Sequence, residues 1–164
     1  TRKEKGEGYS AVKGLFRQFE LVYVAADERD VVRLRTNYRQ GEEVYLFRLN
    51  GSLAQVREFL LNYIRRMNSL RQRPEWYSAL THNCTTSIRQ HTMPYNPNSR
   101  LDWRMIVNGY IDEMLYERKV INTSLPFAEL KKRCYINPRA QAADKSPEFS
   151  QLIRVGVPGV EVRP

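Results

Sequence analysis

The stretch His82-Asn83-Cys84-Thr85-Thr86 joins an aromatic segment to the predicted start of a helix, and it is the part of the chain best suited to chemistry. Asn83 is a favourable N-cap residue, which predicts that Cys84 occupies the first helical position. A helix N-terminus carries about half a positive charge and several unpaired N–H groups, and both stabilise the anionic form of a cysteine. We therefore predict a helix that begins with a reactive thiol.

A nucleophilic cysteine also needs hydrogen-bond donors that hold a developing oxyanion. The backbone N–H groups at the start of the Cys84 helix are candidates for this role. Asn83, Thr85 and Thr86 are the polar residues of this turn, and we expect them to support the helix start. Polar residues around a thiol do not by themselves establish catalysis, because Ser and Thr commonly serve as helix caps.

The base that would activate Cys84 is harder to find. His91 lies seven residues along the same helix, roughly 10 Å away by the helical rise, which is too far for direct proton transfer. His82 lies closer in sequence, on the other side of the cap, and is the local candidate for the base. The residues also allow a simpler interpretation, in which Cys84 is a small core residue on the apolar side of a helix.

Before this stretch, predicted strands and helices alternate. Residues 19–25 form an apolar, partly β-branched run that is typical of a buried strand, and residues 44–49 form a second one. Between them, Asp27 begins a predicted helix that ends at Gln40-Gly41. The sequence therefore predicts an α+β fold.

The clearest predicted helix begins at Ser52 with a capping box and ends before Pro74. Its apolar residues recur at steps of three and four, which predicts that one stripe of the helix packs in the core. The stripe contains Leu53, Val56, Phe59, Leu60, Tyr63, Ile64, Met67 and Leu70.

Three further segments follow Cys84. The helix that it begins is expected to end before Pro94. Asp102 is expected to cap a long helix whose buried stripe runs from Trp103 to Leu115, and Pro126 begins a short helix that reaches about Arg133. Beyond Tyr135 the composition turns to Ala, Pro, Asn and charged residues, so we expect residues 135–164 to form an extended arm.

Length and composition limit the domain organisation. The 164 residues, 41% of them hydrophobic, can bury one core, so we expect a single domain over residues 1–164. The chain begins at Thr1 without an initiator Met, and we expect it to be a piece of a larger protein. No apolar run is long enough for a membrane-spanning helix, and no signal peptide pattern is present.

The two cysteines and two histidines lack the spacing of a zinc site, so we expect no metal and no other cofactor. A disulfide between Cys84 and Cys134 stays open for an oxidising compartment.

The net charge of +9 allows nucleic acid, anionic lipid or acidic protein as partners. Lys and Arg are scattered along the chain, mostly as single residues between apolar ones, which favours solvated helix faces. The aromatic residues lie on apolar stripes and are not interleaved with basic residues, so no platform for stacking bases is evident and we expect no nucleic acid partner.

Several stretches resemble the Lnb-type periplasmic domain of bacterial envelope proteins. The resemblance spans nearly the whole chain and rests on Gly14–Leu21, Ala26–Asp30, Leu34–Asn37, Val44–Leu49, Trp76-Tyr77 followed by Asn83–Thr86, and the later Ile136-Asn137, Ala140–Asp144 and Phe149-Ser150. Together these stretches are fairly specific, whereas any one alone is weak.

The resemblance implies more than the residues show. The family takes its name from a lipoprotein N-acyltransferase and is similar to circularly permuted papain-like thiol enzymes, in which a cysteine opens a helix packed on a sheet. The resemblance therefore implies that Cys84 is the nucleophile. It also implies that the domain is periplasmic or extracytoplasmic, beside membrane-spanning segments. In such enzymes the catalytic histidine comes from a strand before the cysteine. This chain has no histidine before His82, so we expect that histidine in a preceding part of the parent protein.

We therefore expect a thiol-dependent acyltransferase or acyl hydrolase domain of the cell envelope, associated with the membrane and acting on a lipid or lipoprotein acyl group. The alternative is a non-catalytic envelope domain that binds a partner protein or an anionic membrane surface. The basic residues expected to carry that binding are Arg57, Arg65, Arg66, Arg71 and Arg73. The oligomeric state stays open.

Overall fold

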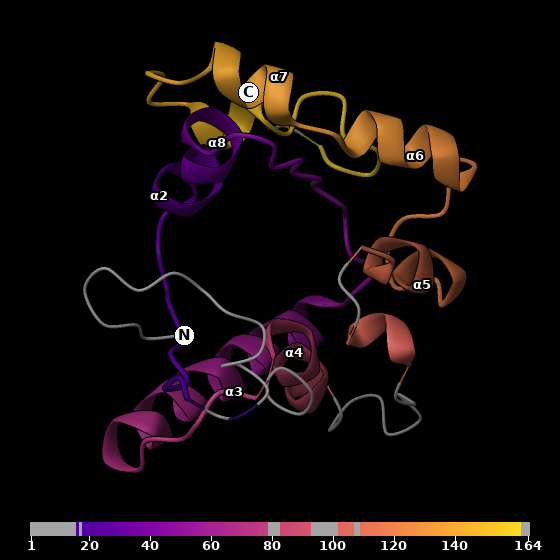
Figure 1. The fold of residues 1–164 in the computed structure, drawn as a ribbon. Coiled ribbons are helices and arrows are strands. Elements are labelled where there is room, and N and C mark those ends of the chain that lie inside the picture. Colours follow the sequence, from indigo (N-terminus) through magenta and orange to yellow (C-terminus); the bar gives the residue numbers. More distant parts are fainter. Residues whose placement is uncertain (1–15, 17, 79–82, 93–101, 107–108, 162–164) are drawn as a thin grey trace. The chain divides into compact units, whose positions relative to one another are not determined.

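The computed structural model describes residues 16, 18–78, 83–92, 102–106 and 109–161 (Figure 1). Contacts divide the chain into two compact units, each built from two separate stretches. Unit 1 consists of Thr1–Val24 and Gly51–Ile111, and unit 2 consists of Ala25–Asn50 and Asp112–Pro164. The expectation of a single domain over residues 1–164 stays a prediction.

The predicted α+β fold is wrong. The structure is 52% helix and 5% strand, and no sheet forms among the described residues. The two predicted strands are extended segments that touch distant residues through isolated bridges, at Glu20–Trp76, Tyr45–Tyr135 and Leu49–Ile121.

The partner segments explain why no sheet grows from these bridges. The backbone of 19–21 bonds to residues 75–77, through Leu21 N–H to Glu75 O at 2.8 Å and Tyr77 N–H to Phe19 O at 2.7 Å. Residues 75–77 are a short link that follows a helix, so they cannot extend a ladder. The same holds for 44–49, whose partners near residue 121 and at 134–136 lie directly beside helices. Among the residues that the structure describes, a papain-like arrangement of helices packed on a sheet is therefore not present.

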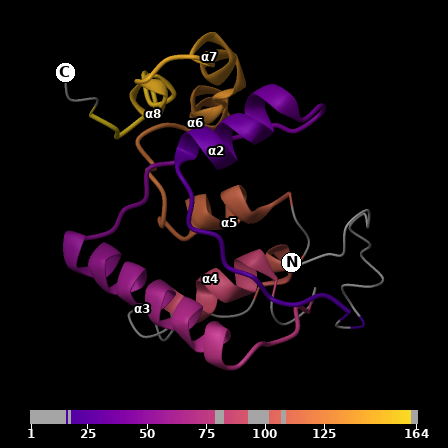
Figure 2. The ribbon, with the colours of Figure 1, turned by 90° about the vertical axis from the view of Figure 1, so that its left-hand side faces the viewer.

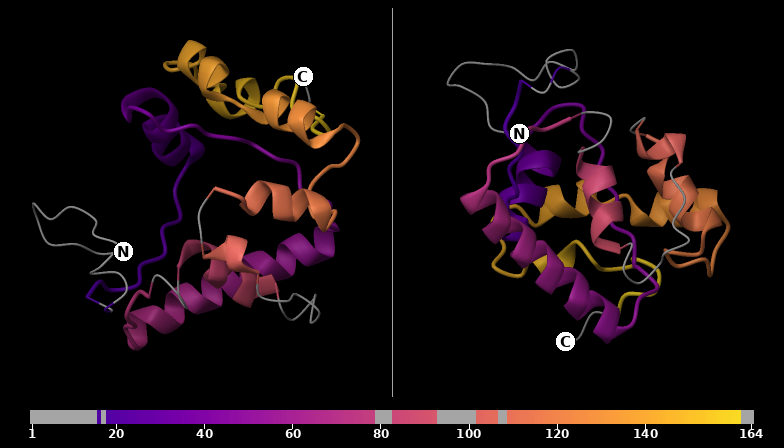
Figure 3. Two further views of the ribbon diagram at one scale, coloured as in Figure 1. Left: turned by 45° about the vertical axis from the view of Figure 1, so that its right-hand side comes forward. Right: turned by 90° about the horizontal axis from the view of Figure 1, so that it is seen from below.

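The described helices of unit 1 are α3 (Leu53–Gln72), α4 (Cys84–Thr92) and the 3-10 turn η2 (Trp103–Met105). The capping box predicted for α3 is confirmed, because the Ser52 hydroxyl accepts from the Gln55 N–H while the Gln55 side chain accepts from the Ser52 N–H. α3 and α4 lie side by side (Figures 2 and 3).

The prediction that the apolar stripe of α3 packs in a core is only partly right. No residue of α3 is buried. Phe59 and Tyr63 are half-buried against α4, whereas the other half of the stripe is exposed. Exposure reaches 89% for Leu53, 53% for Val56, 56% for Leu60 and 45% for Ile64. Among the described elements only α4 packs closely on α3, which is too little to cover the full stripe.

The long helix predicted after Asp102 is interrupted. The Asp102 side chain caps η2 by accepting from the Arg104 N–H at 3.0 Å. The next helix, α5, spans Ile111–Glu117. Gly109 between them has a φ of 128°, which lies far from helical backbone, so a continuous helix cannot pass through it.

Unit 2 is built from short helices around one apolar cluster (Figure 2). The predicted helix after Asp27 is confirmed as α2 (Glu28–Arg33) followed by the π-helical turn η1 (Leu34–Tyr38), and the one after Pro126 is confirmed as α6 (Phe127–Cys134). Gly41, with a φ of 74°, lies three residues after the end of η1. The buried cluster contains Ile121, Leu130, Cys134, Ile136, Ala140, Ala143, Phe149, Ile153 and Val157.

The prediction of an extended arm over residues 135–164 is also wrong. This segment forms α7 (Asn137–Ala142) and α8 (Phe149–Leu152) and supplies most of the buried cluster. Its small and apolar residues recur at steps of three and four, which brings them to one side of each helical turn. The Arg139 guanidinium fastens the segment, because it donates to the backbone carbonyls of Arg133, Tyr135 and Val155.

Candidate functional site

The start of α4 is closed by a set of hydrogen bonds centred on Asn83. Asn83 is buried, and its Oδ1 accepts from the N–H groups of Thr85 at 2.9 Å and Thr86 at 2.8 Å. In return, the Asn83 N–H donates to the Thr86 Oγ1 at 2.9 Å. This is a complete N-cap, as the sequence predicts, and it holds Cys84 in the first helical position.

The same cap narrows the choice of oxyanion donors. The N–H groups of Thr85 and Thr86 are used by Asn83, and the Ser87 N–H makes the first helical bond, to the Asn83 carbonyl at 3.0 Å. Within the described residues, the Cys84 N–H is the donor of this turn that has no acceptor. Thr85 and Thr86 therefore act by shaping the turn, while the N–H of Cys84 itself is the candidate donor to a substrate oxygen.

The Cys84 side chain is exposed, so the interpretation of this residue as part of a core is wrong. Its Sγ lies 3.8 Å from the Thr85 Oγ1. Cys134 is fully buried in unit 2, and burial raises the pKa of its thiol to about 11. Both cysteines are free, so the disulfide that the sequence left open is not formed.

His91 is held inside unit 1, two turns along α4 from Cys84. Its Nε2 lies 3.1 Å from the Tyr23 hydroxyl, and its ring contacts the rings of Tyr23, Phe59 and Tyr63. Burial, together with the nearby Arg66 cation, lowers its pKa. The ring of His91 thus packs against Tyr23 and against Phe59 and Tyr63 of α3. His82 lies outside the described residues.

Two contacts of this region have no signal in the local sequence. The Asn83 Nδ2 donates to the Met105 carbonyl at 3.3 Å, which fastens η2 to the start of α4. The Tyr23 hydroxyl reaches His91 from a segment that the sequence assigns to a strand. Both pairs are distant in sequence, so no periodicity or motif could have indicated them.

The residues of this site lie in a segment that matches a known protein family. The Lnb N-terminal periplasmic domain family matches residues 1–109, about two thirds of the chain. The chain belongs to that family. No curated protein and no solved structure matches it significantly.

Membership of this periplasmic domain family implies an extracytoplasmic location, and it confirms the resemblance drawn from the sequence at the level of the family. The matched residues include Cys84 and its cap. The match does not show a relationship to papain-like thiol enzymes, and it does not show an acyltransferase activity. None of the described helices has the length and apolar character needed to span a membrane.

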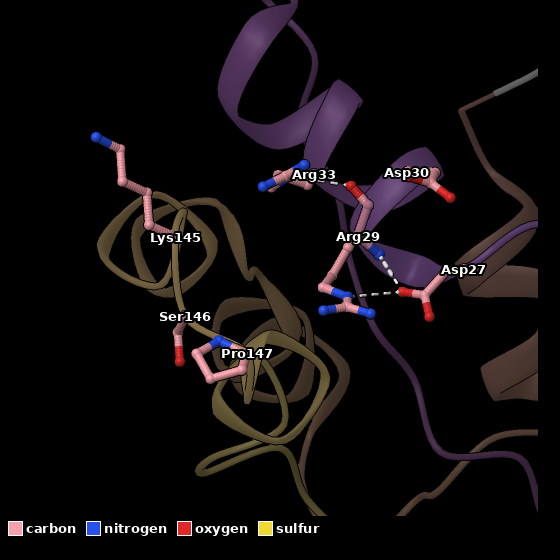
Figure 4. A pocket seen from close by; sticks show the side chains of 7 residues that line it. All are labelled: Asp27, Arg29, Asp30, Arg33, Lys145, Ser146 and Pro147. Carbon is pink, nitrogen blue, oxygen red and sulfur yellow. Dashed lines mark hydrogen bonds and ion pairs between the residues drawn. The ribbon is translucent and has the colours of Figure 1, made fainter.

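Unit 2 of this periplasmic domain has a pocket of its own, of about 320 Å³, that contains none of the predicted site residues (Figure 4). It lies between α2 and the segment Lys145–Pro147, and charges of both signs line it. Arg29 is paired with Asp27 at 3.3 Å, and Arg33 donates to the Asp144 carbonyl at 2.9 Å. These partners neutralise or occupy much of the cationic lining, so the pocket shows no preference for one class of ligand.

Metal chemistry finds no support in the residues that the structure describes. No group of three or more His, Cys, Asp or Glu side chains gathers there in a way that could hold an ion. The site therefore consists of the exposed Cys84 thiol, its own N–H, and the Asn83 cap.

Proposed function

We propose that this periplasmic domain carries out thiol-dependent acyl transfer or acyl hydrolysis with Cys84 as the nucleophile. The observation that supports this most directly is the exposed thiol at the first position of a fully capped helix. The cap aligns the first turn of α4 and fixes the backbone of Cys84 while its side chain stays exposed.

The chemistry is a two-step transfer. The Cys84 sulfur attacks the carbonyl carbon of an ester or amide, and the Cys84 N–H donates to the oxygen that becomes negative. The C–O or C–N bond of the substrate then breaks, the leaving group takes a proton, and a thioester forms on Cys84. An amine or a water molecule attacks this thioester and releases the thiol.

A base must remove the thiol proton and return it to the leaving group. His91 is unsuited to this role because its ring is enclosed by Tyr23, Phe59 and Tyr63. His82 stays the candidate base that this sequence offers.

A lipid or lipoprotein is the proposed acyl donor or acceptor. The proposal draws on the extracytoplasmic location of the family. It also draws on the lipoprotein N-acyltransferase after which, according to the resemblance in the sequence, the family is named. The net charge of +9 favours approach to anionic lipid head groups.

The test uses the protein as it occurs in its natural host and a fluorescent acyl ester in detergent micelles. The wild type should form a thioester that hydroxylamine cleaves, located on the peptide that contains Cys84 by mass spectrometry. Cys84→Ser should lose at least about a thousandfold in turnover while its unfolding midpoint stays unchanged. Cys134→Ser, which removes the buried thiol, is the matched control for loss of a cysteine. Full turnover in Cys84→Ser would exclude the proposal.

A second candidate is a non-catalytic envelope domain that binds a partner protein or an anionic membrane surface. The exposed half of the α3 stripe favours it, because soluble proteins seldom leave such a row uncovered. Arg66 does not belong to that surface, since its guanidinium is paired with Glu75. Absence of any thioester on Cys84, together with retained binding, would favour this candidate over the enzyme.

A further inference from the structure

We propose that the outer face of α3 docks on the surface of an anionic lipid bilayer, with its aliphatic row among the acyl chains and two arginines at the head groups. The proposal concerns unit 1 alone and does not depend on whether Cys84 reacts. It is built on the exposure, spacing and charges of the helix.

The row consists of Leu53, Val56, Leu60 and Ile64, whose exposed fractions are 89, 53, 56 and 45%. At 3.6 residues per turn these four side chains lie within about 80° of the helix circumference and extend over about 16 Å. They are thus one continuous aliphatic strip.

The inner part of the same apolar arc already has partners. Phe59 and Tyr63 face His91 of α4, at centroid distances of 6.0 and 5.4 Å, and Tyr63 also contacts Tyr23 at 4.7 Å. The contacts that hold α3 in unit 1 therefore use one side of the arc. The outer row is left available, so docking requires no unfolding of the helix.

Arg57 and Arg71 give this strip its charge. Arg57 lies one turn after Leu53 and borders the row, while Arg71 lies seven residues after Ile64 and continues it. Within the described part of the chain neither guanidinium has an ion-pair or hydrogen-bond partner. Arg65, in contrast, lies toward the polar side and donates to Asn62 at 3.2 Å.

An aliphatic strip bordered by free arginines fits a lipid surface better than a protein groove. Interfacial helices of this type bury their apolar side by roughly 5–10 Å, and their Arg side chains reach the phosphate level. Anionic head groups complement Arg57 and Arg71 and the net charge of +9. The family of the domain works outside the cytoplasm, in an envelope compartment that is bounded by membranes.

The experiment is co-sedimentation of the full chain with sucrose-loaded vesicles of phosphatidylcholine, with or without about one quarter phosphatidylglycerol. Binding should require the anionic lipid and weaken as salt is raised. Arg57→Gln with Arg71→Gln should lower the partition coefficient by about 25-fold, at about fivefold for each cation. Lys132→Gln, which removes an exposed cation of unit 2, is the matched control and should change it less than twofold.

The aliphatic part has its own matched pair. Val56→Gln and Val155→Gln replace valines of nearly equal exposure, 53 and 50%, in unit 1 and unit 2. Val56→Gln combined with Leu60→Gln should lower binding by about tenfold or more, whereas Val155→Gln should not. Glutamine is a good helix former, and far-ultraviolet circular dichroism checks that α3 remains.

A label at residue 60 provides a second readout that does not rely on loss of binding. In a Leu60→Cys, Cys84→Ser protein, an environment-sensitive fluorophore should shift to the blue with anionic vesicles and be quenched by brominated lipids. No shift, or equal binding by all variants, overturns the proposal and points to a protein as the occupant of the strip. Equal binding to neutral vesicles overturns the assigned role of the arginines. Because this protein lacks the thiol of Cys84, vesicle binding by it is independent of acyl transfer.

Discussion

Asn83 and Thr86 are joined by two reciprocal hydrogen bonds. The Thr86 N–H donates to the Asn83 Oδ1 at 2.8 Å, and the Asn83 N–H donates to the Thr86 Oγ1 at 2.9 Å. Cys84 lies inside this loop of bonds. Its backbone is therefore constrained from both sides while its side chain stays exposed. A nucleophile benefits from such an arrangement because its position is fixed before a substrate arrives.

Replacing Asn83 should separate capping from the contact with η2. Asn83→Ala removes the acceptor for the Thr85 and Thr86 N–H groups and should cost about 1 kcal/mol or more of unfolding free energy. Asn83→Asp retains the cap but lacks the Nδ2 donor to the Met105 carbonyl, so it should lose less. Urea unfolding of both variants checks this order. Equal stability of Asn83→Ala and the wild type would show that the cap contributes nothing.

The two thiols should differ sharply in reactivity. Near neutral pH a maleimide reagent should label Cys84 in the folded protein and leave Cys134 untouched, because Cys134 is buried and its pKa is raised to about 11. Intact-mass measurement should show one label on the native wild type and two after unfolding. Cys84→Ser should show none in the native state. Native labelling of Cys134 would contradict the packing of unit 2.

His91 should make the stability of unit 1 depend on pH. Burial and the Arg66 cation lower its folded-state pKa below the ordinary 6.5, so below about pH 6.5 the unfolded chain binds a proton that the folded one does not. Stability should therefore be full above that pH and decline as the pH falls through the folded pKa. The slope of the unfolding midpoint with pH should be smaller in His91→Gln. An identical slope in both proteins would show that His91 titrates alike in the folded and unfolded states.

The pair of Glu28 and Arg154 should couple the two chain segments of unit 2. Both Arg154 Nη atoms contact the Glu28 carboxylate, at 2.6 and 2.7 Å, and this bonding lowers the pKa of Glu28. A double-mutant cycle with Glu28→Gln and Arg154→Gln should give a coupling of about 1 kcal/mol near neutral pH. The coupling should vanish as acid protonates Glu28. Additive single effects at neutral pH would argue against it.

Two glycines allow the cost of a positive φ to be separated from the cost of steric overlap. Gly159 and Gly41 have φ values of 76 and 74°, but an added Cβ at Gly159 would lie 2.6 Å from the Asn122 Nδ2, whereas Gly41 faces open space. Gly41→Ala should cost about 1 kcal/mol from its backbone alone. Gly159→Ala should cost more unfolding free energy, because the Asn122 side chain must also move, and that side chain accepts a hydrogen bond from the Ser124 N–H. Thermal unfolding of the two variants compares these costs directly.

Helix starts were the features best predicted from the sequence. Ser52 and Gln55, Asp27, and Asn83 each act within three residues along the chain, so the local residues determine the geometry. Pro126 likewise precedes α6 as predicted. For the same reason the sequence placed Cys84 correctly at the start of a helix, although it could not show whether the side chain is exposed.

Features that depend on distant partners were predicted poorly. Residues 19–25 and 44–49 have the composition of strands, yet each meets only short links beside helices, and a sheet needs partners of matching length. Residues 135–164 contain four prolines, which suggested an arm. Their short helices become stable by burying Phe149 and Ile153, which local propensity does not reveal.

Unit 2 is assembled from Ala25–Asn50 and Asp112–Pro164, with residues 51–111 between them in the chain. During synthesis, Val44, Leu46 and Phe47 therefore emerge long before Phe149 and the other buried residues against which they pack. A ribosome adds about 5–20 residues per second, so this β-prone stretch waits several seconds for its cover. Until then these apolar side chains have no partner from the C-terminal segment, so the core of unit 2 can be completed only after its last helix has been made.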